Sequence, residues 1–167
     1  AYNNRGFEFS TVGEMERAFS DYGRAIELDP NYAEPYNNRG IAYWRQGEYE
    51  RAFLHYNKAI ELNPEYGKAY CNRGVYWNHF GQYEKAISDL EKAIALIPES
   101  PNPYKHCGVA WKKKGDMEKA LAYLTKAIKL DPEYEEAYRE RADVFRRIGE
   151  EIKAATDDKA ADDMSAG

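Results

Sequence analysis

One residue pattern returns every 34 residues along almost the whole chain, and it restricts the possible folds more than any other feature. In the stretch 33–66 the pattern is carried by Tyr36, Gly40, Gly47, Ala52, Ala59 and Pro64. The same residue types recur at Tyr70, Gly74, Gly81, Ala86, Ala93 and Pro98, at Tyr104, Gly108, Gly115, Ala120, Ala127 and Pro132, and earlier at Tyr2, Gly6, Gly13, Ala18, Ala25 and Pro30. A period of this length indicates stacked supersecondary units rather than one compact core.

The spacing within one unit predicts two amphipathic helices. Residues at i, i+3, i+4 and i+7 share one helical face, and this spacing is followed by Tyr36, Arg39, Gly40 and Tyr43 and, with small shifts, by Ala52, Tyr56, Ala59 and Ile60. We therefore expect helices at about 34–46 and about 49–62. Gly47 lies between them, where glycine readily takes the left-handed conformation that ends a helix. Pro64 ends the second helix because it has no backbone N–H to donate.

This pattern resembles the tetratricopeptide repeat, with the signature W-x2-L-G-x2-Y, A-x3-F and P. The matching residues are Tyr36, Arg39, Gly40, Tyr43, Ala52, Tyr56 and Pro64, with Tyr in place of Trp and Arg in place of Leu. The resemblance implies an all-α fold, a right-handed superhelical solenoid of antiparallel helix pairs. We expect one domain, 1–167, with repeats 1–32, 33–66, 67–100, 101–134 and 135–167. The last helix is expected to be a polar cap that frays over 164–167, because Asp158 replaces the Tyr or Leu of the earlier copies.

Composition excludes several functional classes. The net charge of −5 and pI near 5.4 disfavour a nucleic-acid binder, which needs a dominant basic surface. No apolar run reaches the length that crosses a bilayer, so no membrane insertion is expected. The chain opens at Ala1 without Met, which suggests a fragment of a longer protein and leaves the compartment open, with the cytoplasm slightly favoured. Cys71 and Cys107 are too few for a disulfide framework.

No motif for catalysis, phosphate binding or metal binding is present in the sequence. Cys71, His79, His106 and Cys107 fall in adjacent first helices, but Cys71 and His79 are eight residues apart. That separation is about 12 Å along a helix, too far for two ligands of one ion. We therefore expect no enzyme activity, no cofactor and no metal.

The arginine in the family's leucine column requires a partner, because an unpaired charge among packed helices is unfavourable. An aspartate follows 16 residues later in three copies, which predicts the structural pairs Arg5–Asp21, Arg73–Asp89 and Arg141–Asp157. Arg39 is followed instead by His55, and both partners are missing at Cys107 and Tyr123. The prediction is a structural pair between the two helices of a repeat rather than a ligand site.

A second face of each first helix is the candidate binding surface. The resemblance implies that first helices line a concave groove that holds a peptide or a partner's helix. An asparagine column that includes Asn38 suits a peptide backbone, since a side-chain amide both donates and accepts. Beside it runs an apolar column, and basic residues gather towards the C-terminus. The predicted groove residues are Asn4, Phe7, Asn37, Asn38, Ile41, Trp44, Arg45, Lys68, Asn72, Val75, Lys105, His106, Val109, Lys112 and Arg139.

These features predict a non-catalytic protein interaction scaffold. Its partner is expected to be a protein or peptide, with acidic residues or a free carboxylate at the basic end of the groove. One alternative is a regulatory or targeting segment of a larger enzyme. Another is a module that grips a chaperone's C-terminal tail, although the Lys and Asn expected one turn apart in a single first helix are not both present. Self-association, through the uncovered first helix or the acidic last segment, is a further alternative.

Overall fold

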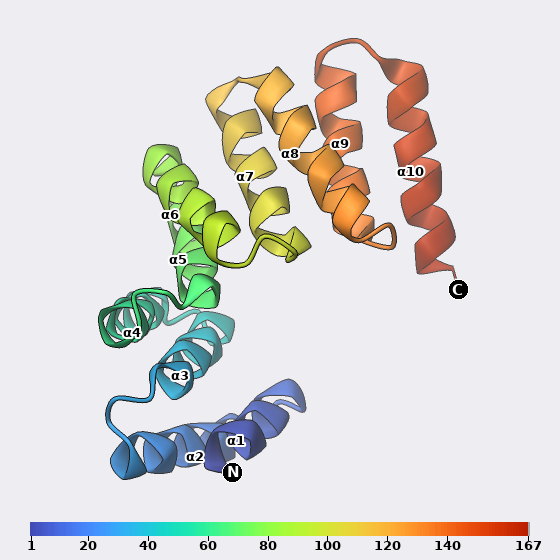
Figure 1. Cartoon of the computed structure of the whole chain (residues 1–167). Helices are drawn as coiled ribbons and strands as arrows, with labels where there is room; N and C mark the ends of the chain where they lie inside the picture. The colour runs from blue at the N-terminus through green and yellow to red at the C-terminus, as the bar shows by residue number, and fades with distance from the viewer. Residues whose placement is uncertain (167) are drawn as a thin grey trace. The chain divides into compact units, whose positions relative to one another are not determined.

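The computed structural model describes residues 1–166, and in this range the chain is built of α-helices joined by short turns (Figure 1). The helices are α1 (Tyr2–Thr11), α2 (Met15–Leu28), α3 (Ala33–Arg45), α4 (Tyr49–Leu62), α5 (Gly67–His79), α6 (Tyr83–Leu96), α7 (Pro101–Lys114), α8 (Met117–Leu130), α9 (Glu135–Arg147) and α10 (Glu151–Ser165). The fold is therefore all-α, as the repeat pattern predicts.

The chain divides into two compact units between Tyr76 and Trp77, within α5. In the first unit, α1 pairs with α2 and α3 with α4, while α3 also contacts α2 and α1. In the second unit, α7 pairs with α8 and α9 with α10, and α9 also contacts α8 and α7. Within the units, α1, α3, α7 and α9 thus lie against their own second helices, and α3 and α9 also lie against both helices of the preceding pair (Figure 1).

Helix boundaries follow the expected turn chemistry. Helices α3 and α4 end within about one residue of the predicted positions. The turn between them contains Gly47 in the left-handed region, with φ of 76°. The glycines at the same place in the other copies have φ between 71° and 90°: Gly13, Gly81, Gly115 and Gly149. A side chain at these positions would strain the backbone, so the glycine column ends each first helix.

A second glycine column allows the two helices of a repeat to approach closely. A Cβ atom added to Gly40 would lie 2.6 Å from Cε1 of Tyr56, and one added to Gly108 would lie 2.6 Å from Cγ of Leu124. In the last repeat this column holds Ala142, which is fully buried. The residue in the facing column there is Asp158, which is shorter than Tyr56 or Leu124.

The core consists of small and large side chains that alternate across the helix contacts. The alanines at the first turn of the second helices are buried: Ala18, Ala52, Ala86, Ala120 and Ala154. Tyr22, Leu90 and Leu124 are also fully buried and occupy the space between helices. Ala33, Ala59 and Ala69 form one such cluster in the first unit, and it is covered by partly buried side chains that include Tyr36 and Leu62.

Helix α10 is more regular than the sequence suggests. The expected fraying of 164–167 is wrong for Met164 and Ser165, which belong to the helix, and Gly167 lies outside the described residues. The buried residues of α10 are Ala154, Asp157 and Ala161, and they face α9. Most other α10 side chains are exposed, and Ile152 is 85% exposed.

Candidate partner-binding surface on the first helices

A row of apolar side chains runs along the first helices of the first unit. Phe7 of α1 is 47% exposed, while Ile41 of α3 and Val75 of α5 are half-buried. They occupy the same repeat column, and α1 lies against α3. In the second unit the column continues with the half-buried Val109 and then changes to Asp143. We call Phe7, Ile41 and Val75 the apolar row.

The asparagines form a chain of amide hydrogen bonds beside this row. Asn38 Nδ2 donates to Asn3 Oδ1 at 3.0 Å, and Asn72 Nδ2 donates to Asn37 Oδ1 at 2.8 Å. Longer contacts of 3.4 Å join Asn3 to Asn4 and Asn37 to Asn38. The predicted asparagine column therefore connects α1, α3 and α5 through amides of the chain itself.

This network changes the expected role of two groove residues. Asn37 is 1% exposed and Asn38 is 8% exposed, so neither has much surface that a partner could contact. Asn4, at one end of the chain of amides, is exposed, and Asn72, at the other end, is half-buried. The sequence could not reveal this, because helix spacing does not show whether the amide of Asn37 or Asn38 faces water or the next repeat.

Trp44 and Arg45 also make contacts within the first unit. The Trp44 ring packs edge-on against Tyr49, with ring centroids 4.8 Å apart, and lies 6.5 Å from the ring of Tyr76. Arg45 Nη1 donates to the Ser10 backbone oxygen at 3.0 Å and to Ser10 Oγ at 2.9 Å. Both side chains therefore help to hold neighbouring helices together.

Several basic residues expected to line the groove are neutralised by carboxylates of the second unit. Lys112 is 6% exposed, and its Nζ lies 2.5 Å from Glu140 Oε2 and 2.7 Å from Asp143 Oδ2. Lys105 is 9% exposed, and its Nζ lies 2.8 Å from Glu136 Oε2. Asp143 has a pKa below its ordinary value because Lys112 donates a hydrogen bond to its carboxylate. These contacts join α7 to α9.

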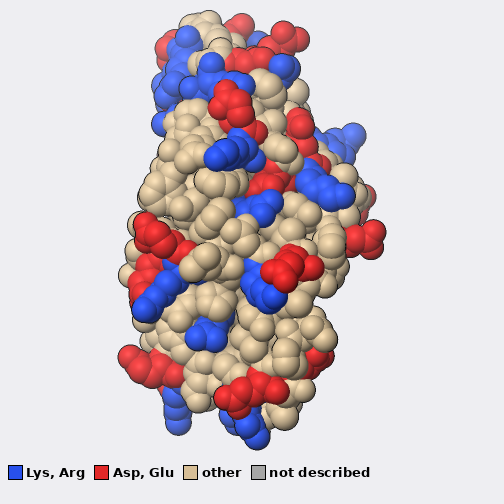
Figure 2. Space-filling model, turned by 90° about the vertical axis from the view of Figure 1, so that its left-hand side faces the viewer, with Lys and Arg blue, Asp and Glu red and all other residues tan. Residues whose placement is uncertain are grey.

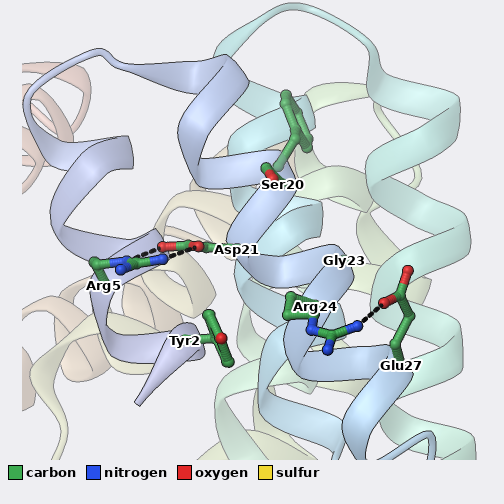
Figure 3. A pocket seen from close by; sticks show the side chains of 8 residues that line it. Tyr2, Arg5, Ser20, Asp21, Gly23, Arg24 and Glu27 are labelled. Carbon is green, nitrogen blue, oxygen red and sulfur yellow. Dashed lines mark hydrogen bonds and ion pairs between the residues drawn. The ribbon is translucent and has the colours of Figure 1, made fainter.

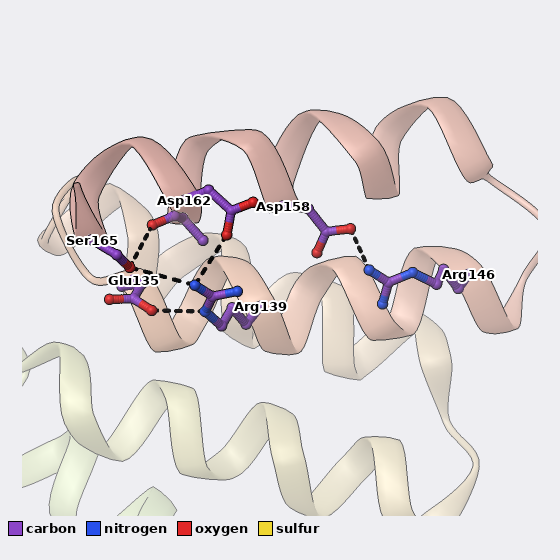
Figure 4. A network of polar contacts seen from close by, with 7 residues as sticks. Glu135, Arg139, Arg146, Asp158, Asp162 and Ser165 are labelled. Carbon is purple, nitrogen blue, oxygen red and sulfur yellow. Dashed lines mark hydrogen bonds and ion pairs between the residues drawn. The ribbon is translucent and has the colours of Figure 1, made fainter.

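The arginines of α9 are paired in the same way (Figure 4). Arg139 Nε lies 2.7 Å from Glu135 Oε1, and its Nη2 lies 3.2 Å from Asp162 Oδ1. Arg146 pairs with Asp158 of α10. Figure 2 shows basic and acidic side chains interspersed over the face that it presents. Lys68 of the predicted groove differs from these residues. It is exposed, and within the described residues it forms no ion pair.

Two histidines are held neutral by their surroundings. Burial lowers the pKa of His106 to about 3, with a smaller contribution from the nearby Lys105. The backbone oxygen of His106 accepts a hydrogen bond from Asn78 Nδ2 at 3.0 Å. Burial also lowers the pKa of His55 to about 4, and the positive charge of Arg39 adds to this effect.

Two of the expected arginine–aspartate pairs are present in the structure. Arg5 contacts both oxygens of Asp21 at 2.6 and 2.7 Å, and Arg141 contacts both oxygens of Asp157 at 2.8 Å. The third pair, Arg73 with Asp89, falls across the division between the units and stays a prediction.

The arginine column has further partners that the sequence reading missed. Arg73 Nη1 donates to Asn57 Oδ1 at 2.7 Å, and Arg141 Nη1 donates to Thr125 Oγ1 at 3.1 Å. Both acceptors lie 16 residues before the arginine on the preceding second helix. The signal was available in the sequence as the same spacing counted backwards.

Comparison with known proteins identifies the repeat. Models described as Tetratricopeptide repeat match residues 33–66, 101–134 and 55–88, and a model described as TPR repeat matches 12–47. The chain belongs to the tetratricopeptide repeat (TPR) family. TPR proteins bind protein partners, and this chain is in general terms a protein interaction scaffold.

Solved structures share the fold of this TPR chain. A MamA structure that spans residue 41 to the end, from Desulfovibrio magneticus RS-1, is 25% identical, with a TM-score of 0.80, and the match covers 99% of this chain and 93% of that one. PilF from Pseudomonas aeruginosa is 21% identical, with a TM-score of 0.89, and the match covers 98% of this chain and 74% of that one. No curated protein sequence matches this chain significantly. Because 349 solved chains match it, the fold alone does not identify a partner.

The first TPR also carries a hollow of about 520 Å³ outside the apolar row (Figure 3). It is lined by Tyr2, Arg5, Phe19, Ser20, Asp21, Gly23, Arg24 and Glu27. Arg5 and Arg24 are paired there with Asp21 and Glu27, at 2.6 and 2.8 Å. Gly23 adds no side chain to its wall.

Three further features bear on chemistry. Cys71 and Cys107 are buried in the TPR helices. Among the described residues no group of three or more His, Cys, Asp or Glu side chains is placed to hold a metal ion. None of the described helices combines the length and the apolar character that a membrane span requires.

Proposed function

We propose that this TPR chain is a non-catalytic scaffold that binds an extended peptide or a partner's helix along the apolar row of Phe7, Ile41 and Val75. The observation that carries the proposal is the exposure of Phe7, 47%, at one end of a column of apolar side chains that repeats at every first helix of the unit. Exposed apolar side chains in a row favour a protein partner over bulk water.

The structure around the row supports binding without large rearrangement. The amide chain from Asn4 to Asn72 and the bond from Arg45 to Ser10 tie α1, α3 and α5 together. A preformed surface loses less conformational entropy when a partner binds. Asn4 and Asn72, at the ends of the amide chain, are then the amides that we expect to contact a partner's backbone.

Apolar contact rather than charge is expected to supply most of the affinity. Lys105 and Lys112 are already paired with carboxylates and are nearly buried, so an acidic partner would first have to displace Glu136, Glu140 or Asp143. A chaperone-tail clamp and a preference for a free carboxylate are thereby less favoured. A targeting segment of a larger enzyme would use the same apolar row. Self-association through this row predicts a mass that rises with concentration in light scattering.

Selection of linear peptides from a library on the full chain tests the proposal. The Phe7→Ser variant should bind the selected peptides at least about ten times more weakly, because full burial of a Phe side chain contributes about 1.5 to 3 kcal/mol. The matched control is Leu54→Ser, since Leu54 is 65% exposed on the second helix α4. Equal loss in both variants, or no loss in Phe7→Ser, would contradict the assignment of the row.

A further inference from the structure

The arginine of the first helix in the last TPR uses acceptors on two second helices. In the last repeat, Nε and Nη2 of Arg141 donate to Asp157, which follows it by 16 residues, and Nη1 donates to Thr125, which precedes it by 16 residues. Asp21 supplies the later acceptor for Arg5, and Asn57 supplies the earlier one for Arg73. The two acceptors hold the guanidinium group on both sides.

Arg39 lacks both of these acceptors. The residue 16 positions before it is Gly23, and the residue 16 positions after it is His55. Its side chain donates a hydrogen bond of 3.4 Å from Nη2 to Tyr43 Oη, and its Cζ lies 5.8 Å from the centroid of the Tyr43 ring. Within the described residues, Arg39 Nε and His55 Nδ1 are buried and have no hydrogen-bond partner. A buried donor without an acceptor is unfavourable, and its presence calls for an explanation.

Open space lies beside Gly23, where the missing acceptor would be. Phe19 of α2 packs against Tyr43 of α3, with ring centroids 4.6 Å apart. Consecutive helices run antiparallel, so Gly23, one turn after Phe19, faces Arg39, one turn before Tyr43. A Cβ atom added to Gly23 would meet no atom within 4 Å. Gly23 also lines the hollow of Figure 3, whose other lining residues belong to α1 and α2.

Gly23 is also unfavourable for the helix that contains it. It lies in the interior of α2, where glycine is about 1 kcal/mol less stable than alanine. No close helix approach requires it, in contrast to Gly40, where Tyr56 leaves no room for a methyl group. Local departures that weaken a fold without a packing reason are expected at functional positions.

We propose that Arg39, together with His55 and the open space beside Gly23, binds the carboxylate of an acidic side chain presented by a partner protein. The guanidinium group matches a carboxylate with two parallel hydrogen bonds, as Arg5 and Arg141 do with their own aspartates. The partner carboxylate takes the place of the earlier acceptor that this repeat lacks, in the open space beside Gly23. The site lies among α2, α3 and α4 and does not include the apolar row, so it is independent of the proposed groove.

The test is an NMR titration of the Arg39 Nε–Hε signal in the full chain with N-acetylglutamate amide. The matched probe is N-acetylglutamine amide, which differs only in the side-chain charge, at the same ionic strength. A saturable shift with the glutamate probe that is at least about threefold larger than with the glutamine probe is expected. Equal responses to both probes would overturn the proposal, and so would a response to inorganic phosphate without one to the glutamate probe.

Two variants restore the acceptors of the other repeats and should close the site. His55→Asp supplies an internal carboxylate, and Gly23→Asn supplies the earlier acceptor. Each is expected to raise the melting temperature and to weaken the glutamate response at least about fivefold. Gly23→Ala is the matched control: it adds a methyl group to open space without an acceptor and should keep the response. A full response in His55→Asp, with the fold intact, would show that Arg39 is not the binding group.

Discussion

Glycine has opposite effects at two helix-interior positions, Gly40 and Gly23. At Gly40 a methyl group would lie 2.6 Å from Tyr56 Cε1 and 3.2 Å from the Ala52 backbone oxygen, and the latter belongs to a rigid helix. At Gly23 the added group meets nothing. The residue type alone therefore does not reveal whether a glycine is required for packing.

We expect Gly40→Ala to lower the free energy of unfolding by about 1 to 3 kcal/mol, because the overpacked contact has to be relieved by movement of α3 or α4. Gly23→Ala should raise it by about 0.5 to 1 kcal/mol through helix propensity. Urea denaturation of both variants beside the wild type measures the difference. If both variants change the free energy of unfolding in the same direction, the difference in packing at Gly40 and Gly23 does not determine the effect of the added methyl group.

The neutral histidines predict a pH dependence of stability. The folded pKa values of His55 and His106 are about 4 and about 3, below the ordinary value of 6.5. Between about pH 6.5 and pH 4 the unfolded chain binds protons that the folded chain does not, so stability falls as the pH falls through this window and is complete above it.

Urea unfolding at about pH 7 and at about pH 5 measures this loss. The double variant His55→Gln, His106→Gln should lose less stability between these two conditions than the wild type. If the losses in wild type and double variant are equal, other groups cause the pH dependence.

Single residues also show which contacts could be predicted from the sequence and which could not. Arg5–Asp21 and Arg141–Asp157 could be predicted because the spacing of 16 residues joins two helices of one repeat. The burial of Asn37 could not, since it depends on which amide of the next repeat donates a hydrogen bond to Asn37 Oδ1.

At the scale of helices, the 34-residue period predicts α3 and α4 within about one residue, because apolar spacing and turn glycines act locally. The ion pairs between α7 and α9 could not be predicted in this way. They join Lys112 to residues 28 and 31 positions away, and whether such side chains meet depends on their directions from two helices. The basic column therefore predicts a charged groove, whereas the structure places acidic neighbours beside it.

Lys112 is the element-scale test of this pairing. Lys112→Ala removes the cation that Glu140 and Asp143 share, and we expect it to lower the free energy of unfolding by about 1 to 3 kcal/mol, since the ammonium group is nearly buried while its partners are about one third exposed. The control is Lys113→Ala on the same helix, where the side chain is exposed and the change should stay within about 0.5 kcal/mol. Chemical denaturation of both variants compares them. Equal stability of the two variants would mean that the ion pairs add nothing to helix packing.

For the whole molecule, α10 combines burial and charge pairing at one end of the second unit. It covers α9 through Ala154, Asp157 and Ala161 and supplies carboxylates to Arg139, Arg141 and Arg146. Deletion of residues 150–167 removes six acidic and two basic residues, which changes the net charge from −5 to −1. A chain near neutrality with a newly exposed apolar face is prone to association.

We expect this deletion to lower the melting temperature and to cause aggregation, measured by a thermal scan with light scattering. A variant that keeps α10 but replaces Asp158 and Asp162, the carboxylates of its more exposed ion pairs, by Asn separates the two contributions. If packing of α10 dominates, this variant stays monomeric and loses only part of the stability, because an exposed ion pair contributes at most about 1 kcal/mol. If it aggregates as the deletion does, the carboxylates rather than the apolar contacts of α10 complete this end of the fold.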